Sequence, residues 1–68
     1  MTVELNGEPV QLARGASLAE AIERLDGEPS GRGIAVAVDG EVVPRSEWPA
    51  TRLTDGQRVE VVGAIQGG

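Results

Sequence analysis

Ser17-Leu18-Ala19-Glu20-Ala21-Ile22-Glu23-Arg24-Leu25 is the segment of this 68-residue chain that has the period of a long helix. Ser17 and Glu20 form the Ser-x-x-Glu pattern of a capping box, in which each side chain bonds a backbone amide that the first helical turn leaves unpaired. The apolar residues of the segment share the i, i+3, i+4, i+7 spacing of one helical face: Leu18, Ala21, Ile22 and Leu25. A helix with a single apolar face is predicted to cover one face of a sheet.

The sequence before this helix predicts a β-hairpin. Val3 and Leu5 alternate with polar neighbours, which is the period of a half-buried strand. Asn6-Gly7 then supplies a turn, because both residues tolerate a positive φ, and Val10 and Leu12 resume the alternation. The chain is therefore expected to open with two antiparallel strands.

The sequence after the helix predicts a second hairpin. Ile34, Val36 and Val38 alternate with small residues, and Asp39-Gly40 is again a turn signal, followed by a short strand at 41–43. This hairpin is reached from the helix by a loop, because the intervening residues are rich in glycine, proline and serine.

A fifth strand is predicted near the end of the chain. Residues 45–48 are expected to turn once as a helix-like segment before Pro49. Asp55-Gly56 then marks a turn, and Val59 and Val61 restore the alternation of a strand.

The order of these elements is hairpin, helix, hairpin, irregular crossover and last strand. It predicts an α+β fold of the β-grasp, ubiquitin-like type, with a mixed five-stranded sheet and one main helix on one face. In that arrangement the last strand lies beside the first and parallel to it. We expect one β-grasp domain over 1–62 and a flexible C-terminal tail over 63–68, since a chain this short supports a single core.

The composition excludes several classes of function. The chain has no Cys, no His and no Lys, so thiolate chemistry, the commonest general base and Schiff-base lysines are all missing, and we expect no metal site. We therefore predict that the protein is not an enzyme. The net charge of −5 argues against nucleic acid or an anionic membrane as partner. The first residues lack the pattern of a signal peptide, which favours a cytoplasmic protein. We also expect the protein to be a monomer when it is not bound to a partner.

The sequence ends in Gly67-Gly68, which is a candidate functional tail. Glycine has no Cβ, so such a tail can be drawn extended into a narrow channel of a partner enzyme. The group it would present is the carboxylate of Gly68. The alternative is that the glycines are incidental, because termini fray and tolerate glycine.

A second candidate site is a docking face on the sheet. If Ile34 and its alternating neighbours face the core, then Ala35 and Ala37 face outward, and Val62 lies opposite to Val59 in the same way. Ala35, Ala37 and Val62 would form a small apolar strip on which a partner could dock. The alternative is that small apolar residues are tolerated on the surface.

Three segments resemble the sulfur carriers of the thiamine pathway, the ThiS-like family. They are the start Val3-Glu4-Leu5-Asn6-Gly7-Glu8, the segment Val43-Pro44-Arg45-Ser46-Glu47-Trp48 and the ending Ala64-Ile65-Gln66-Gly67-Gly68. The resemblance spans essentially the whole chain. The Pro-Arg-Ser-Glu-Trp segment is typical of the thiamine branch and less expected in the molybdopterin branch.

The resemblance implies a role for each tail residue. The carboxylate of Gly68 would be adenylated by a ubiquitin-activating-like adenylyltransferase that uses ATP and magnesium, while the chain itself binds no cofactor. Sulfur derived from a cysteine desulfurase would convert it to a thiocarboxylate, which thiazole synthase would consume. Partners would recognise Ile65, Gln66 and Gly67. The alternatives are a sulfur carrier of the molybdopterin synthase small-subunit type, a non-catalytic β-grasp binding module, and a protein modifier.

Overall fold

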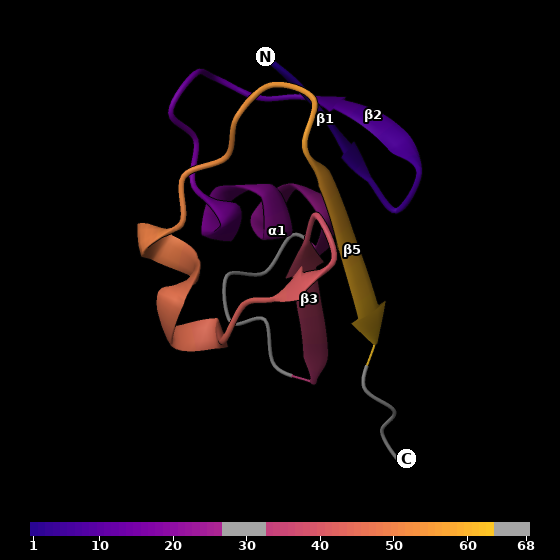
Figure 1. The fold of residues 1–68 in the computed structure, drawn as a ribbon, viewed down its shortest axis with the longest axis vertical. Helices are drawn as coiled ribbons and strands as arrows, with labels where there is room; N and C mark the ends of the chain where they lie inside the picture. Colours follow the sequence, from indigo (N-terminus) through magenta and orange to yellow (C-terminus); the bar gives the residue numbers. More distant parts are fainter. Residues whose placement is uncertain (27–32, 64–68) are drawn as a thin grey trace.

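The computed structural model describes residues 1–26 and 33–63, and in this part of the chain it confirms the predicted mixed five-stranded sheet with one α-helix on one face (Figure 1). The elements follow one another as β1 (Thr2–Leu5), β2 (Glu8–Gln11), α1 (Leu18–Asp26), β3 (Ile34–Val38), β4 (Glu41–Val42), the 3-10 helix η1 (Arg45–Ala50) and β5 (Arg58–Gly63). The last strand extends to Gly63, one residue beyond Val62.

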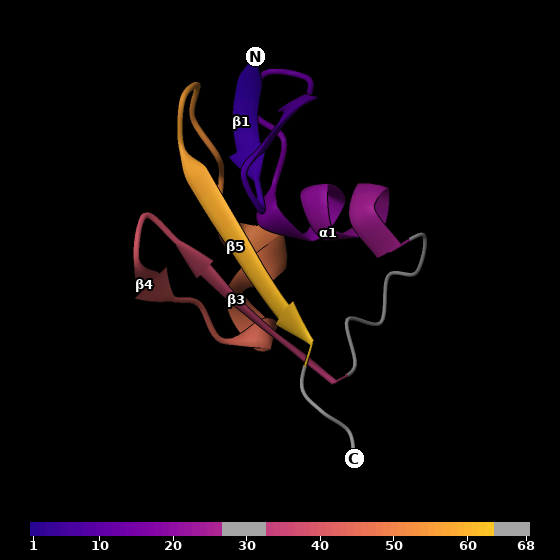
Figure 2. The same cartoon turned by 90° about the vertical axis from the view of Figure 1, so that its right-hand side faces the viewer.

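The strand order is β2-β1-β5-β3-β4, so the last strand along the chain is the central strand of the sheet. β5 pairs with β1 in parallel, with Glu4 opposite Arg58 and Leu5 opposite Val59. On its other side β5 pairs antiparallel with β3 over five residue pairs, from Val38–Val59 to Ile34–Gly63. Figure 2 shows β5 running between β1 and β3. The predicted parallel pairing of the first and last strands is thereby confirmed.

Both predicted hairpin turns are present. Asn6 and Gly7 have φ values of 53° and 85°, and Asp39 and Gly40 have 50° and 88°. Positive φ at both central residues is the signature of the type I′ turn, whose twist matches that of the flanking strands. The turns fix the register of each hairpin, with Leu5 opposite Glu8 and Val38 opposite Glu41.

The N-terminus of α1 shows one of the two bonds of the predicted capping box. The Ser17 hydroxyl accepts the Glu20 amide at 3.2 Å, which satisfies one free donor of the first turn. The reciprocal bond, from the Ser17 amide to the Glu20 carboxylate, is not formed in the described part of the chain. Glu20 faces solvent, and Ser17 is held instead in a strand-like bridge with Arg52.

The core lies between the sheet and a layer that contains α1 and η1. Its buried hydrophobic residues come from the loops and from every element except β2 and β4: Val3, Leu5, Leu12, Ala16, Leu18, Ala21, Ile22, Val36, Val38, Trp48, Leu53 and Val59. Three of the four predicted core residues of the helix are thus confirmed, and the side chain of the fourth, Leu25, lies outside the described residues. Trp48 is 3% exposed and donates its Nε1–H to the carbonyl of Val43 at 2.9 Å.

Candidate functional site

The candidate site begins where β5 ends, at the opposite end of the molecule from the N-terminus (Figure 1). β5 pairs with β1 at its first two residues, and it pairs with β3 from Val59 to its last residue, Gly63. The predicted tail residues lie outside the described ranges: Ile65, Gln66, Gly67 and Gly68. The structure therefore describes the strand that leads to the tail and the face of the sheet beside it.

Two aspartates fix the beginnings of neighbouring strands, Asp39 that of β5 and Asp55 that of β1. One carboxylate oxygen of Asp39 accepts the backbone amide of Arg58 at 3.0 Å, and the other accepts the side-chain amide of Gln57 at 3.2 Å. Asp55 accepts the backbone amide of Thr2 at 2.8 Å. Carboxylates that accept backbone amides close turns and strand ends. These two side chains therefore have structural roles, although they also line a hollow on the outer side of the sheet.

The three predicted docking residues are brought together on the outer face of the sheet, away from α1. Ala35 on β3 lies directly opposite Val62 on β5, and Ala37 lies opposite both Glu60 on β5 and Val42 on β4. Residues opposite one another across paired strands present their side chains on the same face. Val62 is 63% exposed, although it is a large hydrophobic residue. The outward orientation predicted for these residues is confirmed, while their docking role stays a prediction.

Val42 belongs to the same surface and was missed by the sequence analysis. It is 75% exposed and lies beside Ala37. The signal for it was present, because a two-residue turn at Asp39-Gly40 pairs Val38 with Glu41 and therefore Ala37 with Val42. We call Ala35, Ala37, Val42 and Val62 the outer apolar patch.

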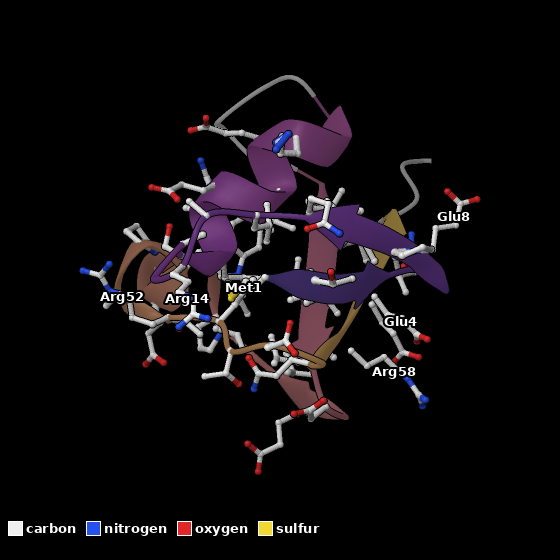
Figure 3. The ribbon with its side chains drawn as sticks, turned by 90° about the horizontal axis from the view of Figure 1, so that it is seen from above. Met1, Glu4, Glu8, Arg14, Arg52 and Arg58 are labelled. Carbon is white, nitrogen blue, oxygen red and sulfur yellow. The ribbon has the colours of Figure 1, made fainter. Side chains whose placement is uncertain are left out.

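Charged side chains border the outer apolar patch on the β1 side. Arg58 Nε lies 3.3 Å from the Glu4 carboxylate, and the two side chains are 66% and 49% exposed. Figure 3 shows them next to one another, with Arg14 and Arg52 on the other side of the view beside Met1. An ion pair this exposed is screened by water and contributes little to stability. The location of this ion pair is more informative than its energy, because the pair lies at the rim of the outer apolar patch.

The described residues offer a surface and a strand end. Within residues 1–26 and 33–63, no three His, Cys, Asp or Glu side chains are placed so that they could hold a metal ion. The helices in the same ranges are too short or too polar to cross a membrane. The surface is the outer apolar patch, and the strand end is that of β5 at Gly63.

The chain is similar to proteins of one family over nearly its entire length. The model of the ThiS family matches residues 3–68. The sulfur carrier protein ThiS of Escherichia coli is 31% identical over 68 residues, which cover all of both chains. The sulfur carrier protein ThiS of Thermus thermophilus is 42% identical over 66 residues, or 97% of this chain and 98% of the relative.

Solved structures agree with the sequence matches. The crystal structure of a thiamine biosynthesis protein (ThiS) from Geobacter metallireducens superposes with a TM-score of 0.81, at 28% identity and with complete coverage of both chains. An NMR solution structure of a thiamine biosynthesis protein from the same organism gives a TM-score of 0.77 at 30% identity, covering all of this chain and 88% of the other. The resemblance inferred from the three sequence segments is thus confirmed, and the chain belongs to the ThiS family.

Proposed function

We propose that the chain is a sulfur carrier protein of thiamine biosynthesis whose working group is the carboxylate of Gly68. The observation that carries the proposal is the family match, which runs to residue 68 and so includes the Gly67-Gly68 pair. Two relatives that match over nearly their whole length bear the name sulfur carrier protein ThiS. Their names favour the thiamine branch over the molybdopterin branch.

The proposed chemistry activates the Gly68 carboxylate, whose oxygen is a poor leaving group until it is joined to AMP. A ubiquitin-activating-like adenylyltransferase would join the Gly68 carboxylate to the AMP part of ATP, with release of pyrophosphate and with magnesium on the phosphates. A persulfide derived from a cysteine desulfurase would then attack the acyl carbon as AMP leaves, and a thiol of a partner protein would cleave the acyl disulfide that forms, releasing the thiocarboxylate and leaving a disulfide on the partner. The resulting thiocarboxylate would donate its sulfur to thiazole synthase. ATP and magnesium belong to the partner enzyme, and the chain is its protein substrate.

The outer apolar patch is proposed as the surface on which the partner enzymes dock. Apolar contacts at the centre of an interface with charged groups at the rim are the usual arrangement of protein complexes. The rim here includes the carboxylates of Glu4 and Glu60, which lie opposite Arg58 and Ala37, and the chain carries a net charge of −5. A partner with an apolar centre and a basic rim would be complementary to it. Since the chemistry consumes ATP, the protein is proposed to act in the cytoplasm, as a monomer between encounters.

The proposal is tested by the intact mass of the protein after a reaction. The purified chain is incubated with ATP, magnesium, the cognate activating enzyme and a sulfur source, and fragmentation localises any change. We expect a mass increase that corresponds to replacement of one oxygen by sulfur, located at Gly68. An unchanged mass, obtained with an activating enzyme that is active on another carrier, would show that the Gly67-Gly68 pair is incidental.

A further inference from the structure

We propose that Asn6 is a positioning residue for the C-terminal tail, acting through the last part of β5. The proposal rests on the sulfur-carrier function proposed above, because it assigns Asn6 a part in presenting Gly68 to the activating enzyme. Asn6 occupies the first central position of the β1–β2 turn and is itself exposed to solvent.

The side-chain amide of Asn6 bonds both backbone groups of one β5 residue. Its Oδ1 accepts the amide of Val61 at 2.8 Å, and its Nδ2 donates to the carbonyl of Val61 at 3.2 Å. The backbone amide of Asn6 also donates to the carbonyl of Val59 at 2.9 Å. One residue of the first hairpin therefore makes three hydrogen bonds to the central strand, between segments that lie far apart in the sequence.

These hydrogen bonds replace the backbone bonds that β1 would make to β5 if β1 continued beyond Leu5. β1 and β5 pair in parallel only as far as Leu5 and Val59, because the chain turns back at Asn6-Gly7. In a regular parallel ladder, one residue bonds its neighbouring strand twice: its amide donates to one carbonyl, and its own carbonyl accepts an amide two residues further along. The Asn6 amide donates to the Val59 carbonyl, so the Asn6 backbone carbonyl would be expected to accept the Val61 amide. Here the Val61 amide donates to the side-chain carbonyl of Asn6 in place of its backbone carbonyl. The side chain supplies a carbonyl and an N–H of the same kind as a peptide group. Asn6 thus extends the ladder by one rung.

The extra rung lies where the direction of the tail is set. Beyond Val59, β5 continues to Gly63 with β3 on one side, and among the described residues Asn6 bonds it on the other. Val61 precedes Val62 of the outer apolar patch and lies two residues before the last residue of the strand. Fixing Val61 from both sides restricts the path along which the chain leaves the sheet. Restriction of a reacting group before the encounter favours productive geometry in the complex.

Two substitutions at Asn6 separate this role from that of the turn. Asn6→Gly keeps a residue that accepts the φ of 53° but removes the side-chain amide. Asn6→Asp also tolerates that φ and can accept from Val61, but it has no N–H for the Val61 carbonyl. Gln11→Ala is the control, because it removes an exposed side-chain hydrogen bond of the same hairpin, to Thr2, that does not involve β5.

The first measurement is amide hydrogen exchange by NMR on the isolated protein. We expect the Val61 amide of Asn6→Gly to exchange roughly tenfold faster than in the wild type, since it loses its acceptor. Exchange at Val36 in the core is expected to stay unchanged, and Gln11→Ala is expected to match the wild type at Val61. Unchanged Val61 exchange in Asn6→Gly would overturn the proposal, whatever the function of the chain.

The second measurement is the steady-state kinetics of adenylation, followed as ATP–pyrophosphate exchange with the cognate activating enzyme. We expect kcat to fall roughly tenfold for Asn6→Gly and less for Asn6→Asp, with KM within about twofold of the wild type, because the β3 and β4 parts of the outer apolar patch are untouched. A variant that was merely less folded would keep its kcat and show a higher apparent KM.

The two measurements distinguish the ways in which the idea can fail. Faster Val61 exchange with an unchanged kcat would show that Asn6 fixes the strand without positioning the tail, which overturns the proposal and leaves the carrier function intact. A wild-type chain that is not adenylated by a competent enzyme would overturn the carrier function and, with it, the tail-positioning role.

Discussion

At the scale of single residues, Ala37 is the position of the outer apolar patch at which a larger or charged side chain is expected to disturb docking most. It lies between β5 and β4, opposite Glu60 on one side and Val42 on the other, and it is half-buried by them. We predict that Ala37→Glu raises the KM for the activating enzyme roughly tenfold or more, because a charge desolvated at the centre of an interface and next to Glu60 disfavours binding. The measurement is the concentration dependence of adenylation.

The matched control is Ala13→Glu, which makes the same change of charge at an exposed loop position outside the outer apolar patch. Ala13→Glu is expected to leave the KM unchanged. The fluorescence of Trp48, the one aromatic residue of the chain, verifies that each variant is folded. A folded Ala37→Glu protein with the wild-type KM would remove the patch from the docking surface.

At the scale of elements, α1 is held by a small number of buried side chains. Ile22 is 1% exposed and lies in the core with residues of β1, β3 and β5. We predict that Ile22→Ala lowers the free energy of unfolding by about 2 to 5 kcal/mol. A domain of this size has a total of about 3 to 10 kcal/mol, so the variant is expected to be close to unfolding at room temperature. Urea denaturation followed by Trp48 fluorescence measures the change.

The control for this prediction is Glu23→Ala, which alters the exposed neighbour of Ile22 on the same helix. Its unfolding midpoint is expected to lie close to that of the wild type, since surface substitutions change stability by about 0.5 kcal/mol or less. Equal midpoints for Ile22→Ala and the wild type would contradict the role of α1 in the core.

Elements were more predictable than the polar contacts between them. Asn6-Gly7 and Asp39-Gly40 could be assigned as turns from the sequence, because positive φ is a local property of those residues. The bonds from Asn6 to Val61 and from Asp39 to Arg58 could not, since they join positions that become neighbours only when the strands are ordered in the sheet. The outward orientation of Val42 could have been predicted but was not. The Asp39-Gly40 turn sets the register that pairs Val42 with Ala37, and Ala37 was already expected to face outward.

At the scale of the whole molecule, the fold and the chemistry are separable. The buried core is made by residues between Val3 and Val59, and the reacting group is proposed to be the carboxylate of Gly68, beyond the end of β5. We predict that deletion of Gly68 leaves the unfolding midpoint unchanged and abolishes incorporation of sulfur, because the new terminal carboxylate of Gly67 falls one residue short of the reacting position. Intact mass after the sulfur-transfer reaction, together with urea denaturation, checks both parts.

Extension of the chain by one glycine after Gly68 is the companion variant for this deletion. It retains the Gly-Gly sequence and a free carboxylate but displaces that carboxylate by one residue, and it is expected to fail in the same way. Sulfur incorporation by the shortened chain at the wild-type rate would contradict the proposed role of Gly68.

The central position of β5 has a consequence for synthesis of the protein. The hairpin β1–β2 and the hairpin β3–β4 are both made early, yet they join into one sheet only through β5, the last described strand to be translated. A nascent chain that has not yet released residues 58–63 from the ribosome carries two hairpins without a common sheet, and isolated hairpins are marginally stable. Val62, part of the proposed docking surface, arrives on that same strand. A partner that requires this surface would therefore bind the chain only after β5 has joined the two hairpins into one sheet.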